Sequence, residues 1–422
     1  MANFYKNKIA RESMESTSTV VPDGIELPAE SVEGTLADIE HDTKPIEAMD
    51  ADAELLAEDG DETDAQLEVL DEAQAAADGE GAGEDGEEPM DAEEDMPDDA
   101  AKALDVAQES IRSRWNFEHR SSVAHESYGS RNRRQVARES LWEDIKAFMK
   151  RILDWLKEQG RKIKDRWLKF HNQGKSIQAR AKKNDAIIRK LGKQKKDEIS
   201  GGFIKSLSID GKFVGDDSTK LKGILTQVSS FYSSKMPSMA AKASAMVEDV
   251  TKGNGAKIEN LKAEFGELAK QDNLKNFKLG NMAVKTEYDN EGGFSTTFVE
   301  SENTVETSVK TPSVGDLAKL NAFFNEVGKQ IEKNVQDYRK VESARKSFED
   351  SIDKLLKEID KVKIDEKPEL TENVRRARRY VTSVNQALSL GEKVIASTQK
   401  HLANGLNGYI SAGIAAYEKT KA

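Results

Sequence analysis

The sequence of 422 residues contains no cysteine. Disulfides, thiolate metal sites and a cysteine nucleophile are therefore excluded. Histidine is also scarce, because only five copies occur and none lies in an HxxxH or HExxH spacing. We therefore predict no bound metal ion and no cofactor.

Catalytic signatures are missing as well. No Gly-x-Ser-x-Gly nucleophile elbow occurs anywhere in the chain. Gly174-Lys175-Ser176 resembles part of a phosphate-binding loop, but that loop needs a further glycine where this chain has Lys169. The sequence therefore argues against an enzyme.

Long apolar runs are also absent, and none approaches the ~18–20 residues that span a bilayer. The residues after Met1 form no apolar core followed by small side chains, so no secretory signal is visible. Together with the lack of cysteine, this fits a protein made in a reducing compartment.

Basic residues are missing between Lys44 and Lys102, whereas residues 51–100 carry 22 acidic residues and no aromatic one. Such a segment cannot bury enough apolar surface to offset the entropy lost on ordering. We predict that the acidic region 13–106 is disordered, with a transient helix at about 53–77.

The charge changes sign along the chain. Residues 1–139 carry a net charge of −26 and residues 140–422 carry +13, of which +10 lies in 140–200. Opposite signs in two parts of a chain indicate an acidic tail on a domain that meets an anionic partner.

A short motif, Ala-x-Glu-Ser, occurs four times and only in the first third of the chain. Average composition predicts fewer than about one copy. A protease that reads small-x-Glu needs a pocket for a short side chain and a cationic site for a carboxylate. The repeats predict cleavage after Glu12, Glu109, Glu126 and Glu139. The motif residues around these bonds are Ala10, Ser13, Ala107, Ser110, Ala124, Ser127, Ala137 and Ser140.

Two interpretations of the repeats stay open. Ala, Glu and Ser are common in helices and linkers, so the motif can recur by composition alone. Alternatively, residues 107–139 form an exposed, arginine-rich linker that a protease can bind in an extended form. On the second interpretation, residues 1–139 are a propeptide and Glu139–Ser140 is the decisive bond.

Residues 140–200 are expected to form a basic amphipathic helical segment. Ser140 and Glu143 have capping-box spacing, and a helical stripe of apolar residues follows them, with Gly160 expected to end or weaken the helix. Residues 201–422 are expected to form a helical domain with a small antiparallel sheet from residues 203–214 and 280–311. The fold class is therefore mainly α (α+β).

Helices are predicted at about 217–234, 238–251, 258–268, 313–362, 371–400 and 404–420. Asp210-Gly211 should be the turn of a hairpin. Strands are predicted at 283–288, 294–300 and 304–311.

The basic residues of the segment 140–200 are candidates for binding DNA phosphates, which Lys and Arg neutralise without reading base sequence. The candidates are Lys146, Lys150, Arg151, Lys157, Arg161, Lys162, Lys164, Arg166, Lys169, Lys182, Lys183, Arg189 and Lys190. A solvated face of a bundle helix is the alternative. Because Trp142, Trp155 and Trp167 lie among them, a membrane interface is a third interpretation.

This layout resembles the internal head (inner body) proteins of giant tailed bacteriophages of the phiKZ type. The resemblance is carried by Ala10-Arg11-Glu12, Ala107-Gln108-Glu109, Ala124-His125-Glu126 and Ala137-Arg138-Glu139, and it does not cover the fold of 203–422. It implies a structural virion protein, made in the host cytoplasm and packaged inside the capsid. Its implied partners are a prohead maturation protease that removes the propeptide, packaged double-stranded DNA, and other capsid or inner-body proteins.

Two other classes remain open at the level of sequence. One is an ejected, membrane-active virion protein that uses the tryptophan-bearing helix. The other is an acidic-tailed chaperone for basic proteins, which leaves the repeats unexplained. The acidic run itself is either a solvated tail, an electrostatic mask for the basic domain, or an assembly scaffold.

Overall fold

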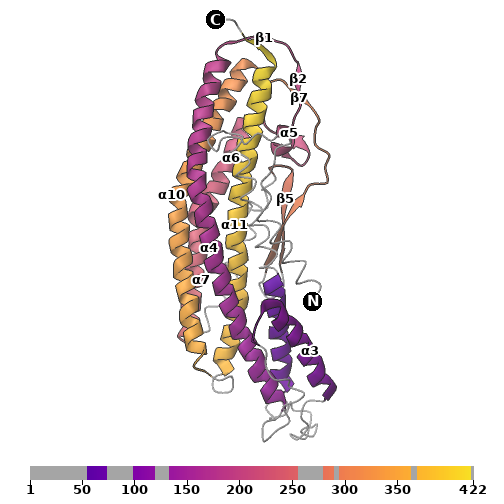
Figure 1. The fold of residues 1–422 in the computed structure, drawn as a ribbon, viewed down its shortest axis with the longest axis vertical. Helices are drawn as coiled ribbons and strands as arrows, with labels where there is room; N and C mark the ends of the chain where they lie inside the picture. Colours follow the sequence, from indigo (N-terminus) through magenta and orange to yellow (C-terminus); the bar gives the residue numbers. More distant parts are fainter. Residues whose placement is uncertain are drawn as a thin grey trace, which may run out of the picture.

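The computed structural model describes residues 55–73, 98–118, 133–254, 279–288, 294–362 and 368–419. Long helices run side by side in an elongated bundle, with short strands beside one half and two N-terminal helices at the other end (Figure 1). The predicted class, mainly helical with small antiparallel elements, is confirmed.

Three long helices form most of the bundle: α4 (Arg133–Ile188), α10 (Val314–Ile359) and α11 (Pro368–Ala415). α4 packs along α10, so the basic segment 140–200 belongs to the same bundle as the later helices. α10 begins where predicted, because the Ser313 hydroxyl oxygen accepts a hydrogen bond from the Asp316 amide at 3.2 Å.

α4 differs from the prediction at two points. It begins at Arg133, so Ser140 lies inside the helix and does not cap it, and it continues through Gly160. The Gly160 backbone lies against α10, where an added Cβ atom would sit 3.5 Å from Arg345 Nη1. Packing along α10 therefore outweighs the roughly 1 kcal/mol that a glycine costs inside a helix. The predicted apolar stripe is confirmed, since all its members are buried: Leu141, Ile145, Phe148, Ile152 and Leu156.

Gly174 lies where α4 and α10 pack closely against each other. A Cβ atom at Gly174 would lie 2.7 Å from the carbonyl oxygen of Gly328 in α10, and a Cβ at Gly328 would lie 2.8 Å from the carbonyl oxygen of Gly174. The two backbones can approach so closely only because neither residue has a side chain. The glycine of Gly174-Lys175-Ser176 thus has a packing role inside α4.

α11 is one helix, whereas the sequence predicts two, at 371–400 and 404–420. The polar and glycine-containing stretch after Lys400 has low helix propensity. Gly405 nevertheless stays helical, because its backbone packs against Leu207, where a Cβ atom would clash. Tertiary packing overrides the local signal here.

The shorter helices agree with the prediction. α6 (Ser218–Ser230) and α7 (Met236–Thr251) correspond to the expected helices, and the π-helical turn η1 (Phe231–Lys235) joins them. Asp217 caps α6 by accepting a hydrogen bond from the Lys220 amide at 2.9 Å. The helix predicted at 258–268 lies outside the described residues.

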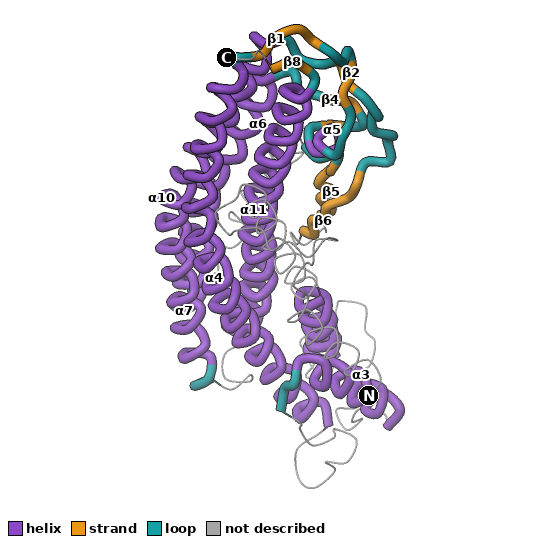
Figure 2. Tube along the Cα trace, turned by 45° about the horizontal axis from the view of Figure 1, so that its top comes forward, coloured by secondary structure: helices purple, strands orange, loops and turns teal. Residues whose placement is uncertain are grey.

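The strands form separate antiparallel pairs instead of one small sheet (Figure 2). The Asp210-Gly211 hairpin is confirmed, with positive φ angles of 50° and 82°. Residues 203–206 are helix α5 (Phe203–Ser206), and of the strand predicted at 304–311 only Val309–Lys310 forms a β-strand. The pairs are β1 (Leu191–Gln194) with β8 (Tyr417–Lys419), β2 (Glu198–Ile199) with β7 (Val309–Lys310), β3 (Ser208–Ile209) with β4 (Lys212–Phe213), and β5 (Met282–Tyr288) with β6 (Phe294–Glu300).

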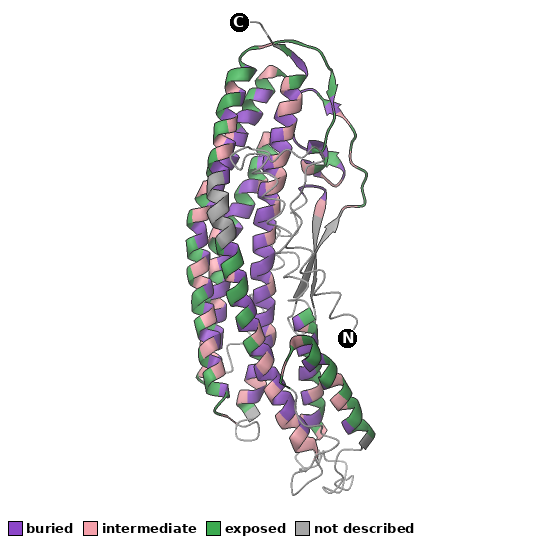
Figure 3. Ribbon diagram, viewed as in Figure 1, coloured by how far each residue is buried: buried purple, intermediate pink, exposed green. Residues whose placement is uncertain are grey.

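The core of the bundle is apolar, and Figure 3 shows buried residues on the facing sides of the helices. Trp142 and Trp155 belong to this core, with 2 % and 4 % of their surface exposed. They are therefore not placed to meet a lipid surface. Within the part of the chain that the structure describes, no helix is long and apolar enough to span a membrane.

Candidate functional site: acidic helices docked on arginines

Two parts of the region predicted to be disordered are helical, so that prediction was wrong for them. Residues 55–73 form one helix, hereafter the acidic helix, and α3 (Asp98–Trp115) is the other. The acidic helix buries Leu56, Leu67 and Leu70, which recur at helical spacing on one face. That spacing is the sequence signal for the helix, and it coincides with the transient helix expected at about 53–77.

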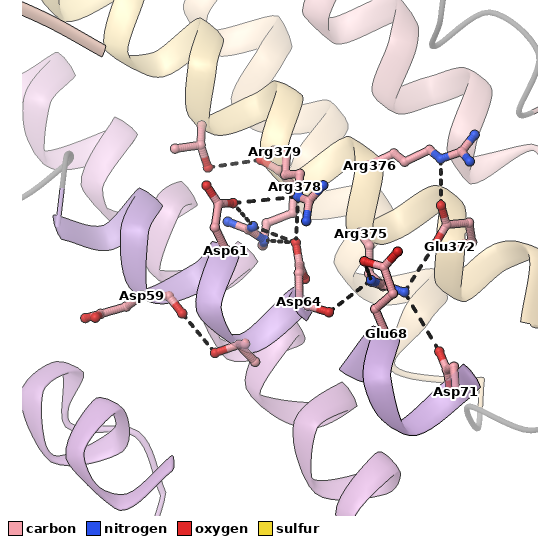
Figure 4. A network of polar contacts seen from close by, with 12 residues as sticks. Asp59, Asp61, Asp64, Glu68, Asp71, Glu372, Arg375, Arg376, Arg378 and Arg379 are labelled. Atoms are coloured by element: carbon pink, nitrogen blue, oxygen red, sulfur yellow. Dashed lines mark hydrogen bonds and ion pairs between the residues drawn. The ribbon is translucent and has the colours of Figure 1, made fainter. Parts of the chain in front are cut away.

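The centre of the docking interface is an ion pair with no exposed side-chain surface. Asp64 of the acidic helix accepts hydrogen bonds at its Oδ2 from Arg378 Nη2 at 2.6 Å and from Arg378 Nε at 2.9 Å (Figure 4). Both side chains are 0 % exposed. Asp61 also pairs with Arg378, and Arg379 lies 3.4 Å from Asp64 Oδ2.

Burial and charge oppose one another in this pair. Burial raises the pKa of Asp64, while Arg378, Arg375 and Arg379 act to lower it. Burial alone would lower the pKa of Arg378, but Asp64 and Asp61 raise it above its ordinary value. The arginine therefore keeps its charge inside the interface and depends on the carboxylates of the acidic helix.

Gly60 makes room for this arginine. A Cβ atom at Gly60 would clash with the guanidinium of Arg378. The acidic helix thus presents a bare backbone one turn before Asp64, where the guanidinium lies.

Arg375 extends the interface along the acidic helix. Its Nη2 donates to the Asp64 carbonyl oxygen at 2.9 Å and to the Glu68 carboxylate at 3.1 Å. Asp71, at the end of the same row, accepts a hydrogen bond from Arg138 of α4 at 2.7 Å. Four carboxylates of the acidic helix therefore face arginines from α11 and α4.

A second buried network links two copies of the Ala-x-Glu-Ser motif. Arg112 of α3 donates to Asp144 Oδ2 at 2.7 Å, to the Ser140 hydroxyl at 2.6 Å and to the Gln108 side chain at 2.9 Å. Arg112 and Asp144 are 4 % and 3 % exposed. Gln108 belongs to the copy that ends at Ser110, so one arginine joins both motifs.

Both of these copies are helical, so the expectation of an extended linker was wrong for them, although Glu109 and Ser110 are exposed as expected. Ala107–Ser110 lies in α3, and Ala137–Ser140 lies in α4, where Ala137 and Ser140 are buried and Glu139 is half-buried. A protease can bind the Glu139–Ser140 bond in extended form only after the first turns of α4 unwind. The other copies, around Glu12 and Glu126, lie outside the described residues.

The predicted DNA-binding residues separate into several groups. Five of these candidates, together with Lys175, form an exposed line along α4. They lie on one side of the helix, because each residue turns the helix by about 100°. Lys175 is the member that the sequence reasoning missed, although the same spacing places it there. We call this line the basic stripe; its members are Lys150, Lys157, Arg161, Lys164, Lys175 and Lys182.

Other candidates lie elsewhere. Lys146 is buried, pairs with Glu143 at 2.7 Å and lies over the Trp142 ring, so it is not available to DNA. Arg151 is half-buried against Trp115. Lys162 and Lys183 are exposed away from the stripe, and Arg189 and Lys190 are exposed just beyond the end of α4. The side chains of Arg166 and Lys169 lie outside the described part of the structure.

The acidic helix does not lie on the basic stripe. Its described ion pairs are with Arg114 of α3, with Arg138 in the second turn of α4, and with the arginines of α11. The six stripe residues remain exposed while the acidic helix is docked. Any masking by the acidic helix therefore acts on the arginines of α11, on Arg114 and on Arg138, and not on the basic stripe.

The described residues contain no group of three or more histidine, aspartate or glutamate side chains that could hold a metal ion. His401 is the one histidine with a described side chain, and it packs against the Gly280 backbone. Burial lowers its pKa to about 4, so it is neutral at pH 7.

A family model described as phiKZ-like phage internal head proteins matches residues 41–415. The match covers the acidic helix, three of the four motif copies and almost the whole bundle. No curated protein and no solved structure matches the chain.

Proposed function

The chain belongs to the phiKZ-like phage internal head proteins, and from that premise we propose that residues 1–139 are a removable propeptide and that α4 carries a surface for packaged DNA. Membership of this family makes it a structural head protein that lies inside the capsid. The proposal adds two partners, a prohead maturation protease and double-stranded DNA.

The observation that supports DNA binding is the basic stripe. Its six cationic side chains are exposed on one side of α4, from Lys150 to Lys182. At 1.5 Å per residue this line is about 48 Å long. Cationic side chains spread along a helix surface can neutralise backbone phosphates without contacting bases, so binding should be non-specific and strongly dependent on salt.

Cleavage after Glu139 would separate a segment of net charge −26 from one of +13. In the intact chain, Arg112 holds the first turns of α4 through Ser140 and Asp144. We therefore propose that α3 undocks before this bond is cut. Undocking would remove the contacts of Arg112 with Ser140 and Asp144 and make it easier for the first turns of α4 to unwind.

We propose that the capping box predicted at Ser140 forms only after cleavage. Ser140 lies inside α4 in the intact chain, so its hydroxyl is not needed as a cap. After cleavage, Ser140 becomes the first residue and Glu143 stands three positions on, the spacing with which both can satisfy free backbone amides. The trimmed helix would then begin at Ser140, whose hydroxyl can cap a helix N-terminus.

The test of DNA binding uses the full chain with Lys150→Gln, Lys164→Gln, Lys175→Gln and Lys182→Gln combined. A matched control replaces Lys319, Lys340, Lys357 and Lys361 by Gln; each is exposed and already pairs with an acidic residue three or four positions away. Both variants lose the same charge.

We expect the stripe variant to bind a short duplex DNA at least about tenfold more weakly at low salt, with a shallower salt dependence. The control should stay within about threefold of the parent. Equal losses in the two variants would show that only net charge matters and would contradict the proposed surface.

A further inference from the structure

We infer that Arg375, Arg376, Arg378 and Arg379 of α11 form a second binding site for DNA phosphates, which the acidic helix occupies in the intact chain. The inference rests on the proposed removal of residues 1–139. It concerns residues about 190 positions beyond the basic stripe, on another helix.

The arrangement of the arginines is that of an anion site. Arg375, Arg378 and Arg379 are spaced i, i+3 and i+4, so they share one side of α11, and that side faces the acidic helix (Figure 4). Guanidinium groups bind carboxylates and phosphates with the same fork of donors. The carboxylates of the acidic helix therefore stand where phosphate oxygens could bind.

The carboxylates form a matching row. Asp61, Asp64, Glu68 and Asp71 recur at intervals of three, four and three residues, which places all of them on one face of the acidic helix. Each pairs with an arginine of α11. One helix thus supplies a line of anions to a cluster of cations.

The energetics favour a role in switching over a role in stability. A buried ion pair adds little net stability, because desolvation offsets its attraction, whereas removal of one partner is strongly unfavourable. Within α11, Glu372 pairs with Arg375 and Arg376. Among the described contacts, it is the one acidic partner of these arginines that would remain after the acidic helix is lost. The uncovered arginines would then be accessible to another polyanion.

Arg378 also keeps an unused donor in the docked state. Its Nη1 has no hydrogen-bond partner among the residues that the structure describes. Its side chain is 0 % exposed. A ligand with more oxygen atoms than a single carboxylate could use this donor.

The experiment releases the acidic helix within the full chain. Asp61→Asn, Asp64→Asn and Glu68→Gln are combined, and the control combines Glu58→Gln, Glu62→Gln and Glu72→Gln. The control residues are exposed on the same helix and form no ion pair with α11 among the described contacts. A third protein carries the first set together with Arg375→Gln, Arg376→Gln and Arg379→Gln.

We expect the first set to raise the affinity for a short duplex DNA about tenfold above that of the control set, with a steeper salt dependence. The added arginine replacements should abolish this gain. Hydrogen exchange of residues 55–73 should show their release.

Two results would overturn the inference: an affinity gain that persists without the arginines, or an acidic helix that stays docked after it has lost these carboxylates. The variant of the basic stripe tests the proposed function independently of this inference. If the basic stripe is required for binding and the α11 arginines are not, only the further inference fails.

Discussion

The acidic helix and the bundle are attached to α11 by different kinds of contact. The acidic helix is joined to it through ion pairs with arginines such as Arg375 and Arg378, and it also buries three leucines, Leu56, Leu67 and Leu70. The bundle is joined through apolar side chains such as Val381, Val384 and Leu388, all buried. A buried ion pair becomes strongly unfavourable when one partner is lost, whereas apolar burial does not depend on a charged partner. Loss of these carboxylates should therefore release the acidic helix and leave the bundle folded.

The largest expected effect lies in the bundle. Phe324→Ala removes a fully buried ring from α10 and should lower the free energy of unfolding by about 3–5 kcal/mol. Urea unfolding followed by circular dichroism measures it. Val69→Ala on the acidic helix is the control, because Val69 is 65 % exposed and its loss should change stability by no more than about 0.5 kcal/mol.

Next comes the docking interface. Arg378→Met leaves Asp64 buried without its main partner, which should weaken docking by about 3 kcal/mol. Hydrogen exchange should therefore accelerate in residues 55–73 while the bundle keeps its protection. Adding Asp64→Leu removes the orphaned charge and should restore most of the protection. Equal acceleration in both regions would contradict the division into two kinds of contact.

A smaller effect is expected on the pH dependence of the stability of the bundle. His401 has a folded-state pKa lowered to about 4 by burial, below its ordinary 6.5. The unfolded chain therefore binds the proton more readily, so the contribution of His401 to stability is present above pH 6.5 and is lost as the pH falls towards 4. Between pH 7 and pH 5 the loss should be up to about 2 kcal/mol.

Urea unfolding at the two pH values measures this loss, and His401→Gln should remove that part of the pH dependence. An unchanged pH dependence in this variant would show that His401 titrates normally in the folded chain.

The smallest effect is expected on the surface of α4. Lys162 and Glu158 form a pair in which both side chains are more than 40 % exposed. Lys162→Gln should change stability by less than about 0.5 kcal/mol. Because Lys162 lies off the basic stripe, DNA affinity should fall less than about twofold, and less than for Lys164→Gln. A larger loss for Lys162→Gln would move the DNA surface to another side of the helix.

Local signals were sufficient for much of the fold. The Ser313 cap, the Asp210-Gly211 turn and the apolar stripe of α4 all depend on residues close in sequence, and the structure has each of them. Near two glycines the predicted helix ends were wrong, because α4 and α11 continue through them. Gly160 and Gly405 are weak helix formers, but each packs against a neighbour that is distant in sequence.

The docking interface could not be predicted by the same reasoning. Asp64 and Arg378 are 314 positions apart, and the acidic composition around Asp64 is typical of disorder when its partners are unknown. Lys146 is a different case, because Glu143 and Trp142 lie three and four positions before it on the same helix, and that spacing could have predicted the contact. The family itself could be recognised, because the repeated motif and the charge reversal are properties of sequence.

The central claim is that the acidic part leaves and the bundle remains. Peptide mapping by mass spectrometry of this protein from mature particles tests it most directly. The account predicts a new amino terminus at Ser140 and no peptide that joins Glu139 to Ser140. A chain in which residues 55–73 and 98–139 remain attached to α4 in mature particles would contradict it.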